Sequence, residues 1–271
     1  MQPTEHPDVQ PTGALEPVTR RPVRTVRRAV FTQDWRDLTY LHWRYPAEVV
    51  ARHLPAGVRP DECDGSAWVG LIPFRMRRVT ILGTPPLPYL SSFLETNVRT
   101  YGVDATGRRV VVFLSLDADR LLPVLAARAS YRLPYMWSRM SAEHAGDVWD
   151  YRCTRRGTPL SPRRGTSSSV RVRIGERLAE PSALDDFLSA RWGLASRWYG
   201  RTVHAPVAHE AWPLYRAELL GLDDGLVTAS GLPAPQGVPH VLFSPGVHVR
   251  IGRPEVVPDV RQTSKTSNAT P

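Results

Sequence analysis

One short segment concentrates residue types that can do chemistry. Within FLETNVRTY (93–101), every second position from Glu95 onward carries a polar group: Glu95, Asn97, Arg99 and Tyr101. Because successive side chains of a β-strand point to opposite faces, a strand here places all four on one face. An acid, an amide, a guanidinium and a phenol in one row suit a polar ligand, with Arg99 holding a carboxylate through two hydrogen bonds. A solvated face on which Glu95 pairs with Arg99 explains the pattern equally well, so both interpretations stay open at this point.

Three other positions could contribute chemistry, and each has a plainer explanation. His42 lies within an aromatic strand, where a hydrogen-bonded core histidine is the commoner outcome. Asp117 and Asp119 resemble a carboxylate pair, but Asp119 is better explained as a helix N-cap. The strand before it is expected to place one alternating set on a single face: Arg109, Val111, Phe113, Ser115 and Asp117.

Known catalytic and metal-binding motifs are missing from the sequence. The histidine pairs His204/His209 and His240/His248 are five and eight positions apart, and neither spacing is typical of zinc. There is no GxGxxG, no Walker loop and no GxSxG, so a serine nucleophile has no local support. We therefore expect no metal and no cofactor.

Short strands dominate the part of the chain that must position these residues. A DATG turn (104–107) joins two of them, and AGD (145–147) marks a second hairpin. Strands are expected over 40–45, 66–80, 93–103, 108–117, 136–144, 148–156, 167–176, 200–209, 212–220, 225–233 and 240–252, with 200–209 and 212–220 as a pair. Short helices are expected over 46–54, 120–131 and 181–192. Roughly ten strands with a few helices predict an α+β, mainly antiparallel barrel or sandwich-like fold.

The ends of the chain differ from its middle. Residues 1–28 are rich in proline and arginine without periodicity, and 258–271 are similar, so we expect a disordered arm and a disordered tail. Residues 29–257 contain no repeat and no long linker, which predicts a single domain. The N-terminus lacks the pattern of a signal peptide, no stretch is long enough for a membrane span, and Cys63 and Cys153 suit reduced thiols. We expect a cytoplasmic protein.

The basic residues are almost all arginine. Of 35 Lys+Arg, Lys265 is the sole lysine, which leaves 34 arginines. The net charge of +9 divides into +2 for 1–28, +1 for 258–271 and +6 for the middle. There the arginines are scattered among acids, and the most basic stretch, 153–165, is expected to be a solvated hairpin tip. Nucleic acid is therefore the least favoured partner, whereas a homo-oligomer stays open.

Several ordered segments together resemble a known family. The blocks LHWRYPAEVVARHLPAGVRPDECDGSAWVGLIPFRM, FLETNVRTYGVDATGRRVVVFLSLDADRLLPVLAARASYRLPYMWSRM and SARWGLASRWYG…VAHEAWPL resemble the uncharacterised bacterial YqjF-like family (domain of unknown function 2071) over about 35–250. One departure is Arg191-Trp192, where the family more often has Arg-Tyr. The family is grouped with the acetoacetate-decarboxylase-like superfamily. The resemblance implies a strongly bent antiparallel barrel with outer helices and a central cavity, lined by the strand that carries Glu95.

The same resemblance limits the mechanism. The best-known enzymes of that superfamily form a Schiff base through a buried lysine. Here the sole lysine, Lys265, lies in the expected tail, and a guanidinium is not a useful amine nucleophile. The resemblance therefore implies the fold without imine chemistry, and the family supplies no established activity.

Two functions remain for the implied cavity. The first is binding of a small polar or carboxylate-bearing molecule by Arg99, Asn97, Tyr101 and Glu95, with His42, Trp43 and Trp68 as walls. The second is a lysine-independent enzyme, such as a lyase, isomerase or cyclase acting on a secondary metabolite. Glu95 would then be the general acid or base, and Tyr101 would donate to a developing oxyanion. A third and weaker hypothesis is a nucleic-acid or interaction module that uses the basic arm.

Overall fold

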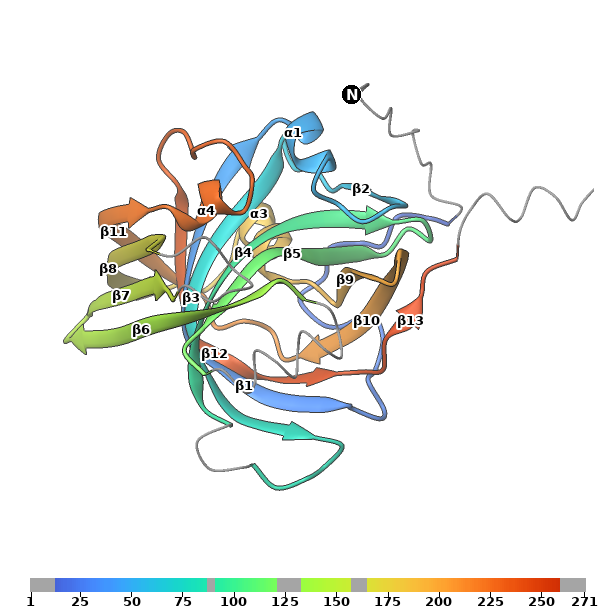
Figure 1. Ribbon diagram of the computed structural model, residues 1–271, viewed down its shortest axis with the longest axis horizontal. Coiled ribbons are helices and arrows are strands. Elements are labelled where there is room, and N and C mark those ends of the chain that lie inside the picture. Colours follow the sequence, from blue (N-terminus) through green and yellow to red (C-terminus); the bar gives the residue numbers. More distant parts are fainter. Residues whose placement is uncertain (1–12, 87–90, 121–132, 157–164, 259–271) are drawn as a thin grey trace, which may run out of the picture.

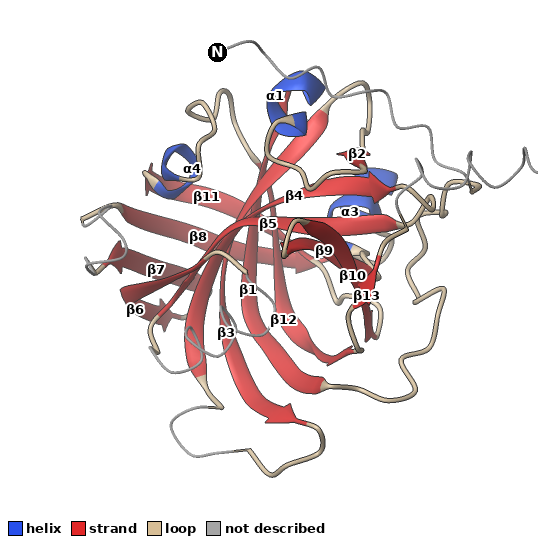
Figure 2. Ribbon diagram, turned by 45° about the vertical axis from the view of Figure 1, so that its right-hand side comes forward, coloured by secondary structure: helices blue, strands red, loops and turns tan. Residues whose placement is uncertain are grey.

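The computed structural model describes residues 13–86, 91–120, 133–156 and 165–258. Strands form most of this part, as Figures 1 and 2 show. It also contains three short helices. The strands are β1 (Phe31–Tyr45), β2 (Val58–Pro60), β3 (Ala67–Ile81), β4 (Phe93–Asp104), β5 (Arg109–Ala118), β6 (Tyr135–Ala145), β7 (Val148–Arg155), β8 (Ser167–Arg177), β9 (Gly193–Trp198), β10 (Arg201–His209), β11 (Tyr215–Asp224), β12 (His240–Ile251) and β13 (Glu255–Val256). The helices are α1 (Ala47–Ala51), α3 (Ala183–Ser189) and α4 (Leu226–Ala229). The predicted α+β, mainly antiparallel barrel is confirmed.

The strands close into two rings that share a central sheet. The shared strands are β12, β1, β3, β4 and β5, in that order. On one side β9 and β10 connect β5 back to β12, and on the other side β6, β7, β8 and β11 do the same. Pairing is antiparallel throughout the described strands except between β5 and β6 and between β5 and β9. In Figure 1 the two sets of closing strands lie on opposite sides of the strongly curved β1, β3 and β12.

Each ring encloses one face of the shared sheet. Leu71 and Val98 belong to a core that also contains Trp149 and Val172 from β7 and β8. Their neighbours along the same strands, such as Ile72, belong to a second core with Leu194 and Val207 from β9 and β10. Because alternate side chains of a strand point to opposite faces, one sheet serves both cores. We call these the β6–β8 side and the β9–β10 side of the sheet.

The two predicted hairpin turns form as the sequence indicates. In 104–107, the backbone N–H of Gly107 donates to the carbonyl of Asp104 at 2.9 Å, and Gly107 has φ 89°. Gly146, between β6 and β7, has φ 58°. Glycine takes such values without the steric penalty that a Cβ atom would introduce. Ser182 and Asp185 form a capping box at the start of α3, as the helix prediction for 181–192 requires.

Three sequence-based expectations fail in the described part of the chain. Residues 225–233 were expected to be a strand but contain α4, because the Asp224 carboxylate caps the backbone N–H groups of Leu226 and Val227. The expected pair of 200–209 with 212–220 does not form, since β10 pairs with β9, β12 and β13 whereas β11 pairs with β8 and β12. Strand β9 was not anticipated. The predicted helix 120–131, the tip of the loop 153–165 and most of the tail 258–271 lie outside the described residues.

The N-terminal arm also differs from the expectation of disorder. Residues 1–12 lie outside the described part, but 13–28 make specific contacts with the barrel. The carboxylate of Glu16 accepts from the backbone N–H of Arg109 at 2.9 Å, and Arg20 pairs with Asp186 at 2.8 Å. A polar, proline-rich segment can be ordered by such bonds without any hydrophobic periodicity, which is the pattern that sequence analysis detects. No helix in the described residues is long and apolar enough to cross a membrane.

Candidate functional site

A cavity of about 130 Å³ lies on the β9–β10 side of the shared sheet. Its wall is mainly apolar and aromatic, with a few polar side chains among them. The lining residues are Phe31, Gln33, Trp35, Leu38, Ile72, Phe74, Met76, Glu95, Asn97, Arg99, Val111, Phe113, Leu116, Leu133, Tyr135, Ser189, Arg191, Gly193, Leu194, Val207, His209, Trp212 and Ile251. A cavity of roughly 150 Å³ accommodates a molecule such as benzene, so this one fits a small organic molecule. The cavity that the resemblance implied is present, and the strand bearing Glu95 lines it.

Arg99 carries a positive charge into this cavity without a carboxylate beside it. Its side chain is 5% exposed, and none of the ion pairs of the described residues includes it. Nε donates to the hydroxyl of Tyr101 at 3.1 Å, and Nη2 donates to the carbonyl of Leu188 at 3.0 Å. Nη1 has no partner among the described residues. The sequence hypothesis of an internal Glu95–Arg99 pair on a solvated face is therefore wrong, since both side chains are buried and they are not paired.

Tyr101 and His42 form a layer behind Arg99 rather than a part of the cavity wall. The Tyr101 hydroxyl donates to the carbonyl of Leu188 at 2.7 Å, and it lies 2.6 Å from Nε2 of His42. Because the single phenol proton is used on Leu188, His42 must donate through Nε2. Burial and the neighbouring Arg99 hold the pKa of His42 well below its ordinary value, so its ring is neutral. Tyr101 thus orients Arg99. The phenol proton of Tyr101 is already used in its hydrogen bond to Leu188.

Glu95 occupies another part of the wall and is protonated at neutral pH. Its carboxyl group is 3% exposed, and burial raises its pKa from 4.5 to about 8, with a smaller contribution from the charge of Asp117. The hydroxyl of Tyr135 donates to Oε2 at 3.0 Å, and the side chain of Asn97 also hydrogen-bonds the carboxyl group. The Oδ1 atom of Asn97 is buried without a partner among the described residues. A protonated Glu95 and an unsatisfied amide oxygen make this part of the cavity polar and uncharged.

Arg191 also contributes to the cavity wall, and its guanidinium group shares the carboxylate of Asp61 with Arg109. Its Nη1 donates to Asp61 at 2.6 Å, and Arg109 binds the same carboxylate. The Nε and Nη2 atoms of Arg191 are buried without a hydrogen-bond partner among the described residues. Its Cζ lies 4.6 Å from the ring centroid of Tyr101, and Cζ of Arg99 lies 5.4 Å from the same centroid. Both guanidinium groups therefore pack near the ring of Tyr101.

His209 adds a neutral acceptor within an aromatic cluster. Its ring lies 4.5 Å from Trp192 and 4.9 Å from Trp212 between centroids. Nδ1 is 2.6 Å from the carbonyl of Glu210, so Nδ1 carries the proton and Nε2 carries the lone pair. Burial lowers the pKa of His209 to about 4, which keeps the ring neutral at physiological pH. His209 is thus a candidate hydrogen-bond acceptor for a ligand.

His42, Trp43 and Trp68 were predicted to form walls of the cavity, and none of the three lines it. Trp43 lies on the β6–β8 side of the sheet with Leu41 and Val50 at its core, not in the cavity. Trp68 donates from Nε1 to the carbonyl of Cys63 at 3.3 Å and lies under Arg44, also away from the cavity. Neither residue lines this cavity. Trp43 follows His42 directly on β1 and so faces the opposite side of the sheet, whereas the sequence does not indicate how far along β3 from the cavity Trp68 lies. His42 faces the correct side but is covered by Tyr101.

The face predicted for β5 is also wrong beyond Phe113. Val98 pairs with Ser115 but Arg99 pairs with Phe113, so a bulge at Leu114 shifts the alternation by one residue. Val111 and Phe113 line the cavity, whereas Ser115 and Asp117 bond to Arg155 on the β6–β8 side. Asp119 accepts from the backbone N–H of Leu94 at 3.1 Å. Asp117 and Asp119 therefore do not act as a carboxylate pair.

Several cavity residues were not anticipated from the sequence. Tyr135, Arg191, His209 and Trp212 come from segments that are distant from β4 along the chain. In the sequence, Arg191 stands out only as a departure from the family pattern, and His209 only as one of a histidine pair without zinc spacing. No group of three or more His, Cys, Asp or Glu side chains suited to a metal ion occurs within the described residues. Lys265 lies outside them.

Comparisons with solved structures place the fold in one class. The enduracididine biosynthesis enzyme MppR in complex with pyruvate superposes with a TM-score of 0.61 at 15% identity, covering 92% of this chain and 99% of that one. Acetoacetate decarboxylase from Legionella pneumophila gives a TM-score of 0.59 at 11% identity, covering 88% and 91%. At these identities the likeness is one of fold alone. The chain has an acetoacetate-decarboxylase-like barrel.

Sequence comparison then gives the family. Residues 32–248 match the family DUF2071, described as an uncharacterized conserved protein. The uncharacterized protein YqjF of Bacillus subtilis is 29% identical over 215 residues, which cover 79% of this chain and 87% of that protein. The chain belongs to the DUF2071 family, and the predicted membership is confirmed.

Proposed function

We propose that the protein binds a small carboxylate-bearing organic molecule in the cavity, with Arg99 as its anchor. The observation that carries this proposal is that a buried, cavity-lining guanidinium has no carboxylate partner among the described residues. An unpaired buried charge is strongly unfavourable, and a ligand carboxylate would remove most of that cost. Nη1 of Arg99 is uncommitted, whereas Nε and Nη2 are held by Tyr101 and Leu188. The group is therefore fixed in place before a ligand arrives.

The rest of the wall supports a ligand of moderate size with an apolar portion. Trp35, Phe74, Phe113 and Trp212 line the cavity, and His209, whose Nε2 carries the lone pair, offers a hydrogen-bond acceptor. Such a mixture of apolar surface with a few fixed polar groups is typical of small-molecule sites. MppR, which shares the fold, is described in complex with pyruvate, itself a small carboxylate.

A thermal-shift screen of small carboxylic acids tests the proposal. At a concentration of 100 times Kd, a ligand adds about 2.7 kcal/mol of stability, or roughly 5–10 °C in Tm for a chain of this size. We expect this shift in the wild type and in Arg171→Met, a control at an exposed arginine on β8. Arg99→Met, which keeps the apolar stem, should lose it. Equal shifts in all three proteins would disprove the anchor.

A second function is favoured by the state of Glu95. We propose as an alternative that the protein is a lysine-independent lyase, isomerase or cyclase in which Glu95 transfers a proton. A carboxyl group with a pKa of about 8 is close to the working pH, where general acid–base catalysis is efficient. Turnover of a molecule found in the screen, lost in Glu95→Gln while binding persists, would establish the enzyme. Full turnover in that variant would exclude this role.

A further inference from the structure

His209, the last residue of β10, brings a hydrogen-bond acceptor to the wall of the cavity. The carbonyl of Glu210 can only accept, so Nδ1 of His209 carries the proton and Nε2 carries the lone pair. Nε2 has no hydrogen-bond partner among the described residues. Unlike the unpartnered nitrogen atoms of Arg191, it is not closed off by protein atoms. A ligand in the cavity can therefore donate a hydrogen bond to it.

The aromatic neighbours of His209 hold its ring without satisfying Nε2. The ring centroids of Trp192 and Trp212 lie 4.5 and 4.9 Å from that of the imidazole. Nε1 of Trp192 donates to the carbonyl of Thr19 at 3.1 Å, and Nε1 of Trp212 donates to the carbonyl of Ser189 at 3.0 Å. Both indole N–H groups are thus used elsewhere. The acceptor is oriented before a ligand arrives, which lowers the entropic cost of binding.

The charges of the cavity wall select an uncharged donor on the ligand. Glu95 is the single acid among the described residues that line the cavity, and it is protonated at neutral pH because its pKa is about 8. Burial, with a smaller contribution from the charge of Arg99, lowers the pKa of His209 to about 4, so this ring is neutral as well. A ligand ammonium group would meet the like charge of Arg99 and no carboxylate. A hydroxyl group can donate to His209 without this penalty.

We propose that the natural ligand is a short hydroxycarboxylic acid, whose carboxylate binds Arg99 and whose hydroxyl group donates to Nε2 of His209. This rests on the proposed function, in which Arg99 anchors a carboxylate. An oxo acid would bring a second acceptor to the lone pair of His209, and an unsubstituted acid would leave that lone pair without a donor. The cavity volume of about 130 Å³ restricts the ligand to a short chain. His209 is then the residue that determines specificity within the class of carboxylic acids.

Calorimetric titration with acids of one chain length tests this inference. Both enantiomers of lactate and 3-hydroxypropionate are compared with propionate, pyruvate and alanine at pH 6, where Glu95 is protonated. We expect the best hydroxy acid to bind about tenfold more tightly than propionate, since one hydrogen bond to a buried acceptor contributes about that much. Pyruvate and alanine should bind more weakly than that hydroxy acid. Tighter binding of pyruvate or alanine, or equal binding of propionate, would overturn the hydroxy-acid class.

Variants of His209 separate this inference from the proposed function. His209→Phe keeps an aromatic ring but has no lone pair, so the preference for the hydroxy acid over propionate should fall to about one, with the Kd of propionate unchanged within about twofold. His209→Gln retains an acceptor and should keep part of the preference. His144→Phe makes the same exchange at an exposed histidine on β6 and should keep all of it.

Folding of each variant is checked by circular dichroism, and His209→Leu, which also lacks the lone pair, replaces His209→Phe if the latter does not fold. A preference that survives in the folded variant without a lone pair would overturn the role of His209 while leaving Arg99 intact. Failure of every acid, propionate included, to bind the wild type would instead overturn the proposed function itself.

Discussion

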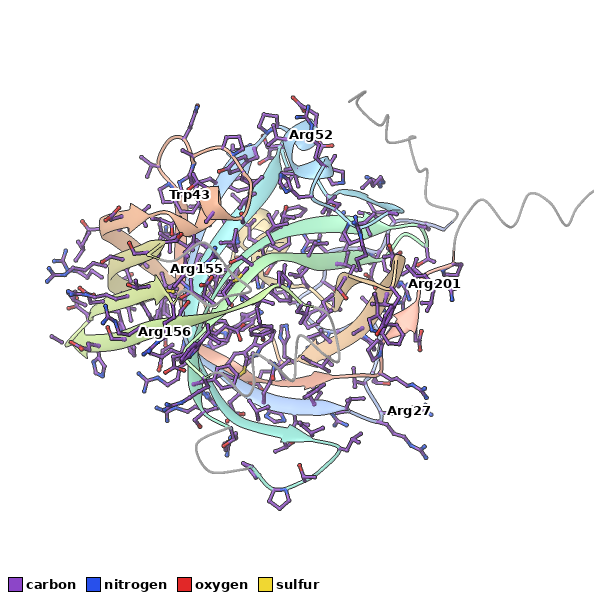
Figure 3. All side chains as sticks on the ribbon, in the orientation of Figure 1. Arg27, Trp43, Arg52, Arg155, Arg156 and Arg201 are labelled. Carbon is purple, nitrogen blue, oxygen red and sulfur yellow. The ribbon has the colours of Figure 1, made fainter. Side chains whose placement is uncertain are left out.

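Buried arginines lie against both faces of the shared sheet, Arg99 on β4 and Arg155 on β7, and the two faces differ in charge balance. On the β6–β8 side, Arg155 and Asp117 are 2% and 0% exposed and form two hydrogen bonds of 2.8 and 2.9 Å. Ser115 accepts a further hydrogen bond from Nη2 of Arg155, and Ser138 donates one to Oδ1 of Asp117. On the β9–β10 side, Arg99 has no carboxylate at all. Figure 3 shows Arg155 within the molecule, whereas Arg27, Arg52 and Arg201 lie at its periphery.

This difference, and not burial, is the reason to assign Arg155 to the architecture and to propose Arg99 as a ligand-binding residue. A buried charge that is paired and fully hydrogen-bonded belongs to the architecture, and its loss leaves the partner uncompensated. A buried charge without a partner lowers the stability of the empty protein, and such a residue is retained when binding or catalysis needs it. The four predictions below test this distinction, beginning with the largest expected effect.

Arg155→Met should destabilise the protein severely. It leaves the Asp117 carboxylate buried without a counter-charge, which costs about 3–5 kcal/mol. Guanidinium denaturation of this variant and of the double variant Arg155→Met/Asp117→Leu measures the effect. The double variant should recover most of the loss because both charges are then absent. If the double variant is as unstable as the single one, the pair is not the cause.

Glu95 makes stability depend on pH in a direction opposite to most carboxylates. Its pKa is raised to about 8, so the folded protein keeps a proton that the unfolded chain loses near pH 4.5. Unfolding therefore releases a proton between these values, and stability falls as the pH rises through this window. With about 1.4 kcal/mol per pKa unit, the loss from pH 5 to 8 is on the order of 3 kcal/mol.

Glu95→Gln is the matched control for this dependence. It keeps the shape and hydrogen bonds of the protonated acid but cannot ionise. The buried histidines His42, His204 and His209 have lowered pKa values and make the stability of both proteins rise with pH to the same extent. We therefore expect the urea midpoint of the wild type to fall relative to that of Glu95→Gln between pH 5 and 8. Parallel curves for the two proteins would show that Glu95 titrates normally.

Arg99→Met should stabilise the empty protein. Removing an unpaired buried charge is expected to raise stability by about 1 kcal/mol, or 2–4 °C in Tm. Leu188 keeps a hydrogen bond from Tyr101 after the substitution, so no carbonyl is left bare. Differential scanning calorimetry of ligand-free protein measures the change. A lower Tm than that of Arg171→Met would place Arg99 in the same structural class as Arg155.

Arg20→Ala should hardly change the free energy of unfolding, which is the smallest effect expected among the four predictions. Arg20 pairs with Asp186 at 2.8 Å, but its side chain is 48% exposed. Exposed ion pairs contribute roughly 0–1 kcal/mol. We expect a change within about 0.5 kcal/mol in urea denaturation. A loss approaching that of Arg155→Met would show that the arm 13–28 depends on this contact.

Local patterns were sufficient to predict much of the barrel. Alternation in 93–101 placed Glu95, Asn97 and Arg99 on one face, and Gly107 marked the following turn. The capping residue Ser182 located α3. These features depend on neighbours within a few positions, which is the range over which sequence patterns are informative.

Contacts between distant segments and single-residue irregularities of a strand could not be predicted from the sequence. The bulge at Leu114 reverses the face of Asp117, and nothing in the alternation of β5 indicates it. Asp61 meets Arg191 across 130 positions, so no spacing could have shown their contact. Whether Arg99 is paired depends on every element that surrounds it. The sequence could therefore suggest Arg99 as a ligand-binding residue but could not show that it lacks a carboxylate partner.

The most direct test of the account is the affinity of one carboxylic acid for three proteins. Calorimetry at pH 7 would compare the wild type, Arg99→Met and Arg171→Met with the acid that gives the largest thermal shift. Truncating one partner of a buried charge pair costs at least about 2 kcal/mol, so Kd should rise about thirtyfold or more in Arg99→Met and stay unchanged in Arg171→Met. The same Kd in all three proteins would contradict the claim that Arg99 is kept unpaired for a carboxylate.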